Sequence, residues 1–227
     1  MLTTQQKRLR EEISEGHVDT YASDIVRFLR RYVTMDEVWV YHYDPETKEQ
    51  SKEWRKPEEG APRKFRVAAS ARKILASVFW DADGIIMVHY HEKGETITAN
   101  VFCDLLVKLK EALKSKRRGK LRSGVLFHMD NAPAHKARKT LDLLADLGFE
   151  IMSRPPYSPD LAPSDYFLFP KLKSFLKGKR FACDYDVMSA VNGYFEEQDK
   201  TFYKSGIEML FKRYDKFIKV GGDYVEK

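Results

Sequence analysis

The order of apolar patterns along the chain constrains its fold more than any other feature. Two segments rich in β-branched and aromatic residues come first and predict strands, at 33–43 and, as a hairpin turning at Asp81–Gly84, at 73–94. Short apolar strands then alternate with segments of helical period. These strands are expected at 124–130 and 149–152, and the helices at 98–116, 133–147, 166–176 and, twice, from residue 186 on. Strands followed by such an alternation predict a mixed α/β sheet flanked by helices.

Two segments lie outside this alternation. Residues 3–31 predict one or two helices, broken at Gly16, with many charges and little core. We interpret residues 1–31 as a helical linker and residues 32–227 as one domain. Residues 44–66 are polar and contain three prolines, which indicates an excursion inserted at about 44–70. A loop of this length in a compact domain usually serves an interaction.

Charge and hydropathy restrict the class of protein. Lys and Arg number 40 against 34 acidic residues, and the net charge of +6 suits a polyanionic partner, although many soluble proteins share it. No segment approaches the roughly 20 apolar residues that span a bilayer. The first twelve residues are too charged for a secretory signal. We therefore expect a soluble, intracellular protein without a membrane partner.

Three aspartates occupy unusual places. Asp36 interrupts an apolar strand, Asp130 ends a strand before a turn, and Asp165 follows a proline-rich segment and opens a helix. A charge in an apolar strand is costly to bury without a partner, and carboxylates suit Mg²⁺ or Mn²⁺. Two such ions about 3.5–4 Å apart can catalyse phosphodiester chemistry. Taken singly, each aspartate is more simply explained as a turn former or a helix cap.

Longer blocks around these aspartates resemble those of a known family. TMDEVW (34–39), HMDNAPAH (128–135) and PPYSPDLAPSDYFLFP (155–170) resemble the three signature blocks of mariner transposases. Asp130 and Asp165 leave the 34-residue gap of the three-aspartate mariner class. KGKRF (177–181), FYKSGIEML (202–210) and GGDYVEK (221–227) are similar too. Val38 and Phe167 replace the usual Thr and His of the family, and neither is a metal ligand by motif.

The resemblance implies an RNase H-like fold and cut-and-paste transposition of DNA in the nucleus. Strands would be hydrolysed at transposon ends, and the 3′-hydroxyls joined to a TA target. By position, Asp36, Asp130 and Asp165 become the catalytic ligands of two Mg²⁺ ions, which Mn²⁺ would replace. The family also carries an N-terminal helix-turn-helix pair, to which nothing here is similar. Since Leu2 and Thr3 resemble the end of the family's linker motif, we expect a truncated form with an added Met1 and a weakened homodimer.

Several neighbouring residues have both a functional and a structural interpretation. His128, Asn131 and His135 are candidates to support the metal-binding carboxylates from behind, although His128 is equally well explained as a semi-buried histidine and Asn131 better as a helix start. Asp160 is the rival third ligand, but its place between prolines suits a turn. Trp39 and Trp80 are expected in the core.

Two further groups are possible contacts with DNA or a partner subunit. The basic run contains Lys116, Arg117, Arg118, Lys120 and Arg122, and it suits either phosphate binding or a solvated helix end. In mariner enzymes the loop matching residues 44–66 reaches the partner subunit. We therefore expect a dimer or DNA contact at Trp54, Arg55 and Lys56.

Two other functions fit the same motifs less well. One is a domesticated, inactive DNA-binding module, against which the three intact aspartates speak. The other is a general RNase H-type nuclease that acts on RNA–DNA hybrids.

Overall fold

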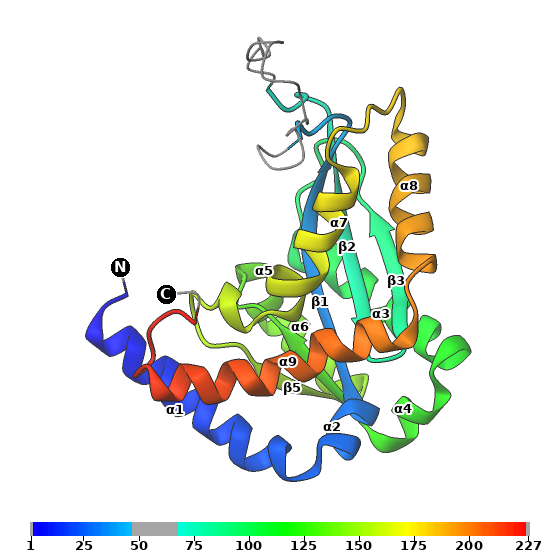
Figure 1. Cartoon of the computed structure of the whole chain (residues 1–227). Coiled ribbons are helices and arrows are strands. Elements are labelled where there is room, and N and C mark those ends of the chain that lie inside the picture. The colour runs from blue at the N-terminus through cyan, green and yellow to red at the C-terminus, as the bar shows by residue number, and fades with distance from the viewer. Residues whose placement is uncertain (1, 47–67, 226–227) are drawn as a thin grey trace, which may run out of the picture.

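The computed structural model describes residues 2–46 and 68–225 (Figure 1). Its centre is a five-stranded sheet in the order β3-β2-β1-β4-β5. The strands β1, β2 and β3 pair antiparallel, whereas β1, β4 and β5 pair parallel, so the predicted mixed sheet is confirmed. The bounds are Tyr32–Tyr41 for β1, Lys73–Asp81 for β2, Gly84–Tyr90 for β3, Val125–Met129 for β4 and Phe149–Ser153 for β5.

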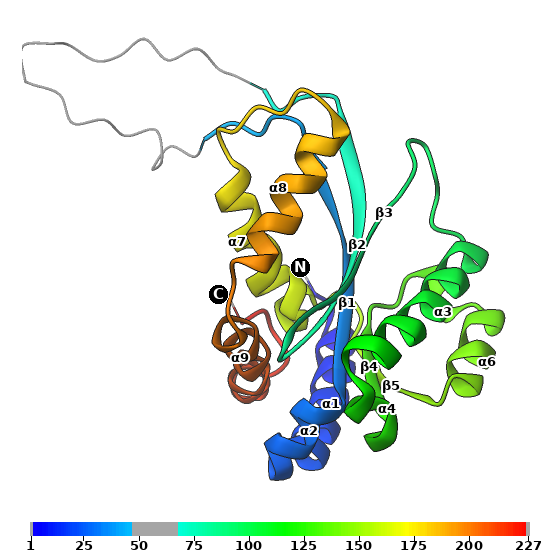
Figure 2. The ribbon, with the colours of Figure 1, turned by 90° about the vertical axis from the view of Figure 1, so that its right-hand side faces the viewer.

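Helices cover both faces of this sheet. Figure 2 shows α7, α8 and α9 on one side and α3 and α6 on the other. The bounds are Thr4–Tyr21 (α1), Ile25–Arg31 (α2), Ala99–Lys116 (α3), Arg118–Ser123 (α4), Pro133–Lys136 (α5), Arg138–Asp146 (α6), Phe169–Leu176 (α7), Asp184–Glu196 (α8) and Lys200–Lys219 (α9). Shorter turns are η1 (Ala22–Asp24), η3 (Pro159–Leu161) and η4 (Ser164–Leu168), the last a π-helix.

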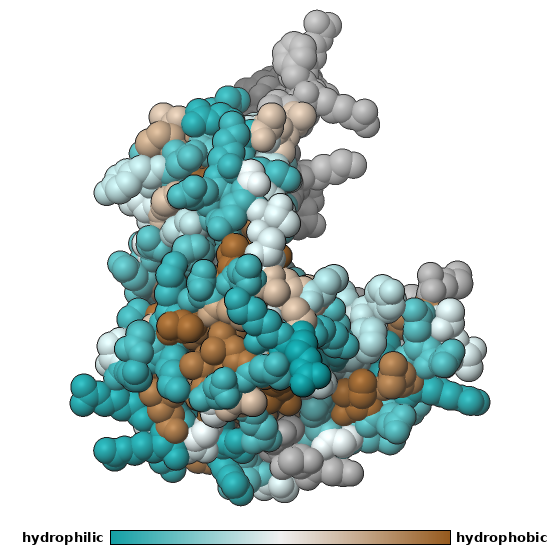
Figure 3. Space-filling view, turned by 180° about the vertical axis from the view of Figure 1, so that it is seen from behind, coloured by the Kyte–Doolittle hydropathy of each residue, from teal (hydrophilic) through white to brown (hydrophobic). Residues whose placement is uncertain are grey.

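Alternating residues of the strands pack into two separate hydrophobic cores. From β1, Val38 and Val40 pack into the larger core under α7–α9, whereas Val33 and Met35 pack into the smaller core under α3. The outer surface on the α3 side is largely hydrophilic, with apolar side chains gathered in its lower part (Figure 3). Because both faces are covered, β1 is buried for most of its length, and any charge on it needs a partner.

Three local expectations were wrong. The α1 helix continues through Gly16, since a single glycine weakens a helix by only about 1 kcal/mol. The expected helix over 133–147 is divided at Ala137 into α5 and α6. Trp80 is fully buried as predicted, but Trp39 is 42% exposed, and its ring lies 4.0 Å from the Lys73 ammonium.

The N-terminal helix α1 packs against α9 (Figure 1). It also contributes a buried charge. Arg10 is fully buried and donates to Asp160 at 2.8 Å, to the Ser158 hydroxyl at 2.7 Å and to the Tyr157 carbonyl at 2.7 Å. Thus α1 holds the proline-rich loop in place. The interpretation of residues 1–31 as a linker stays a prediction. Within the described residues, no helix has the length and apolarity needed to cross a membrane.

We predict that Arg10→Ala lowers the free energy of unfolding by about 3–5 kcal/mol, because it leaves the Asp160 carboxylate buried without its cation. Lys7→Ala is the matched control on the same helix. Its ion pair with Asp223 is partly exposed, so the loss should be about 0–1 kcal/mol. Urea unfolding measures both, and equal small losses would contradict the structural role of Arg10.

Candidate active site

The three aspartates converge beside the carboxyl end of β4, next to the central strand β1. Thr34 of β1 is in register with His128 of β4, and the two strands are parallel. Asp36 and Asp130 each lie two residues further along, so the neighbouring strands carry them to adjacent positions. Asp165 lies in the first turn of η4, which contacts β1. The described structure therefore brings together the predicted ligands, although their metal-binding role stays a prediction.

A cation lies between two of these carboxylates. Arg154 follows β5, and its Nη1 donates to Asp36 Oδ2 at 2.9 Å and lies 3.9 Å from Asp165 Oδ2. Arg154, Asp130 and Asp165 also line a pocket of about 360 Å³. Sequence reasoning missed Arg154, which belongs to none of the family blocks quoted above. The one available signal was its position, directly after a strand that ends beside Asp130.

Burial and mutual repulsion raise the proton affinity of these carboxylates. Burial raises the pKa of Asp36 to about 7, with Arg154 opposing this shift and Asp165 and Glu37 adding to it. Burial also raises the pKa of Asp165, against the effect of Arg154. Arg154 alone therefore compensates the negative charge only in part. Such a site attracts a further cation.

Asp130 has its own positively charged partner. His135 Nδ1 bonds to Asp130 Oδ1, and His135 Nε2 lies 3.6 Å from Glu37 Oε1. Burial opposes protonation, but the hydrogen bond to Asp130 and the nearby Glu37 carboxylate raise the pKa of His135 to about 9. Burial acts against ionisation of Asp130 as well, yet the bonds from His135 and the Ala132 amide lower its pKa. The geometry thus supports His135 as the residue that orients Asp130.

The other two proposed supporting residues have different places. His128 is fully buried, and its Nδ1 is hydrogen-bonded to the Tyr32 hydroxyl at 2.6 Å. Burial holds the pKa of His128 well below 6.5, so of its two interpretations the structure favours the buried structural histidine. Asn131 does not start α5, whose N-cap is Ala132. Instead, Asn131 donates to the Arg154 carbonyl at 2.6 Å and ties together the ends of β4 and β5.

Much of the basic run is part of the fold. Lys120 is only 4% exposed, and its Nζ bonds to the Leu29 carbonyl at 2.8 Å and lies 3.4 Å from Asp81. Arg117 Nε donates to the same Asp81 at 3.0 Å. Lys120 and Arg117 thus compensate a buried carboxylate, which favours a structural role for both over phosphate binding.

For the other residues of the basic run and for residues 54–56, a contact with DNA or a partner subunit stays a prediction. Lys116 is exposed but bonds through Nζ to the Ile86 carbonyl at 2.8 Å, while Arg118 and Arg122 remain exposed. The run precedes β4, so it lies at the opposite end of that strand from Asp130. Asp160 is paired with Arg10 and is no ligand of the aspartate site. Trp54, Arg55 and Lys56 lie outside the described residues.

Comparisons with known proteins agree with this arrangement. The family model described as transposase (partial DDE domain) matches residues 44–123. The chain is 34% identical over 227 residues to the histone-lysine N-methyltransferase SETMAR of Homo sapiens, covering 99% of this chain and 32% of that protein. It is 35% identical over 201 residues to the mariner Mos1 transposase of Drosophila mauritiana, covering 88% of this chain and 57% of that protein. The chain thus spans less than two thirds of either relative.

A solved structure of the Mos1 transposase catalytic domain, with raltegravir and Mn, covers the fold nearly end to end. Its TM-score is 0.82 at 30% identity, over 99% of this chain and 98% of that chain. Fold and site define a transposase catalytic domain of the DDE class with the predicted RNase H-like sheet. The chain belongs to the mariner transposase family.

We predict that the charge on His135 stabilises the metal-free fold in a pH-dependent way. Its folded pKa of about 9 exceeds the ordinary 6.5, so this contribution is complete below about pH 6.5 and is lost as pH rises through about 9. The difference in unfolding free energy between wild type and His135→Gln should therefore shrink by up to about 3 kcal/mol between about pH 6 and 10.

The matched control for this prediction is His17→Gln. Burial lowers the pKa of His17, so its contribution should stay constant above about pH 7. Urea unfolding in EDTA across the pH range compares the two variants. A constant difference for His135→Gln would show that His135 carries no stabilising charge.

Proposed function

We propose that this chain cleaves DNA strands at transposon ends and transfers them to TA target sites, using two divalent metal ions held by Asp36, Asp130 and Asp165. The observation that carries the proposal is the convergence of these carboxylates: Asp36 and Asp165 flank the buried cation of Arg154, and Asp130 lines the same pocket as Arg154 and Asp165. Solved Mos1 structures similar to this chain include the catalytic domain with Mn or Mg and a paired-end complex with the left transposon end.

The donor set fits Mg²⁺ or Mn²⁺. All three predicted ligands offer carboxylate oxygens, which hard cations prefer. Asp130 and Asp165 border a pocket, and Asp36 is 8% exposed behind Arg154. Burial raises the pKa values of Asp36 and Asp165, and Arg154 only partly offsets this, so a bound cation would favour their ionised forms. When bound, the ions would activate an attacking hydroxyl and stabilise the leaving oxygen of a phosphodiester.

The residues of the chain prepare this site before the ions bind. The hydrogen bond from Arg154 fixes the orientation of Asp36. His135 and the Ala132 amide together fix the orientation of Asp130. The hydrogen bond from Asn131 to the Arg154 carbonyl sets the distance between the two strand ends. Groups positioned in advance lose little freedom when substrate binds, which favours catalysis.

The partners and the cellular place belong to the same proposal. A DNA substrate is supported by the family and by the net positive charge. A homodimer and a nuclear location follow from the resemblance to mariner enzymes. The inactive DNA-binding alternative is less well supported, since all three aspartates are intact and converge. Binding of DNA without cleavage in Mn²⁺ would favour it.

We predict that Asp36→Asn, Asp130→Asn and Asp165→Asn each reduce Mn²⁺-dependent nicking of supercoiled plasmid by about a thousandfold or more, because each removes a charged ligand of the reacting centre. The matched control is Asp104→Asn, a change of the same chemistry at an exposed position of α3. Circular dichroism should show all four variants folded. Undiminished nicking by any one of the three variants would remove that aspartate from the site.

A further inference from the structure

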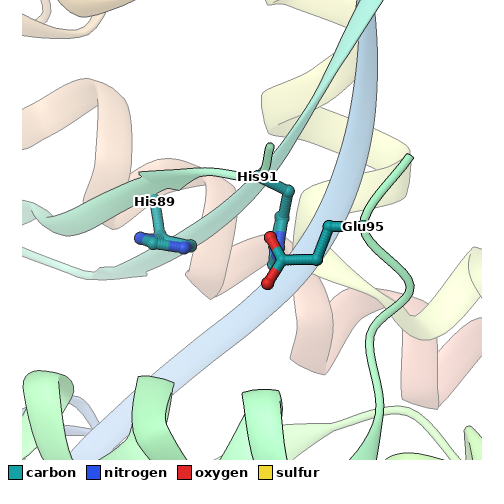
Figure 4. A group of neighbouring side chains, drawn as sticks. All are labelled: His89, His91 and Glu95. Carbon is teal, nitrogen blue, oxygen red and sulfur yellow. The ribbon is translucent and has the colours of Figure 1, made fainter. Parts of the chain in front are cut away.

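A second group of side chains, remote from the aspartates, has the composition of a metal site. His89, His91 and Glu95 each offer a ligand atom, and these three atoms lie within 4.8 Å of one another (Figure 4). His89 belongs to β3, and His91 follows two positions later on the same face. A turn closed by the bond from the Glu95 amide to the Glu92 carbonyl, 3.0 Å, returns Glu95 to His91. We propose that this cluster binds Zn²⁺ or a similar divalent transition-metal ion.

The distances suit such an ion. A tetrahedral Zn²⁺ with ligands at about 2.0–2.1 Å holds neighbouring donor atoms roughly 3.3 Å apart. His91 Nδ1 lies 3.1 Å from Glu95 Oε2, close to this value. The rings of His89 and His91 lie edge to face with centroids 4.9 Å apart. Within the described residues, the ring nitrogens of His89 make no hydrogen bond, so a lone pair there is available.

The ligands are also supported from behind. His91 is 5% exposed, and its Nε2 is hydrogen-bonded to the Ser77 hydroxyl at 2.8 Å. Ser77 is fully buried on β2, directly opposite His89 in the antiparallel register. The Glu92 amide donates to Glu95 Oε2 at 3.2 Å. The Ser77 bond reaches the ring nitrogen of His91 that faces away from the proposed ion, and such bonds fix the orientation of ligands in metal sites.

This cluster differs from the aspartate site in chemistry and in location. Two imidazoles and one carboxylate favour Zn²⁺, Co²⁺ or Cu²⁺, whereas an all-carboxylate set favours Mg²⁺ or Mn²⁺. Ser77 and His89 lie on the α3 side of the sheet, next to Phe79 of the smaller core. Asp36 lies opposite Val78, which packs in the larger core on the other side. The proposal therefore does not depend on the transposase chemistry.

The test is a calorimetric titration of Zn²⁺ into the whole chain in the presence of excess Mg²⁺, which occupies carboxylate sites. A single Zn²⁺ site is expected in wild type and in Asp36→Asn. It should be lost in His89→Ala and in Glu95→Gln. Ser77→Ala should weaken Zn²⁺ binding by about 10–100-fold, since it removes the bond that orients His91.

The matched control is His42→Ala. His42 Nε2 lies 2.8 Å from Asp184 Oδ1, a histidine–carboxylate pair that belongs to no ligand group of three within the described residues. This variant should bind Zn²⁺ as wild type does. No Zn²⁺ binding by wild type would overturn the proposal, as would unchanged binding by folded His89→Ala and Glu95→Gln or an equal loss in His42→Ala. Circular dichroism checks the fold of each variant.

Discussion

Carboxylates buried side by side repel one another, and the candidate active site depends on how the fold compensates this repulsion. Asp36 and Asp165 share the cation of Arg154, and Asp130 has that of His135. These cations come from the end of β5 and from α5, so the site requires all its elements to be assembled. The remaining negative charge is what a divalent ion would balance, which links the packing of the sheet to the proposed chemistry.

The proline-rich loop that leads to Asp165 is fixed by a distant part of the chain. Arg10 of α1 bonds to three successive parts of this loop, at Tyr157, Ser158 and Asp160. Tyr157 has a φ of +55°, a backbone conformation that non-glycine residues seldom adopt, and the Arg10 bond to its carbonyl helps to hold it. Arg213 of α9 also donates to the Asp160 carbonyl at 3.0 Å. The terminal helices thus position the third aspartate.

Sequence patterns predicted the features that depend on residues close together in the chain. Period-two and helical patterns located the strands of the sheet and most helices, and the motif blocks located Asp36, Asp130 and Asp165. These patterns did not predict contacts between residues that are far apart in the sequence. Lys120 belongs to a basic run, yet its ammonium group pairs with the buried Asp81. Arg154 reaches the aspartates only because β5 lies beside β4. Likewise, His128 lies only two residues before Asp130, but it is fully buried and bonded to Tyr32 of β1.

The most direct test of the central claim is diffraction from crystals of this chain soaked in Mn²⁺ and measured for anomalous scattering. The account predicts anomalous peaks bounded by Asp36, Asp130 and Asp165. Arg154 should then either leave Asp36 or share that carboxylate with the ions. Peaks confined to other places, or none near these carboxylates at a Mn²⁺ concentration that supports nicking, would contradict it.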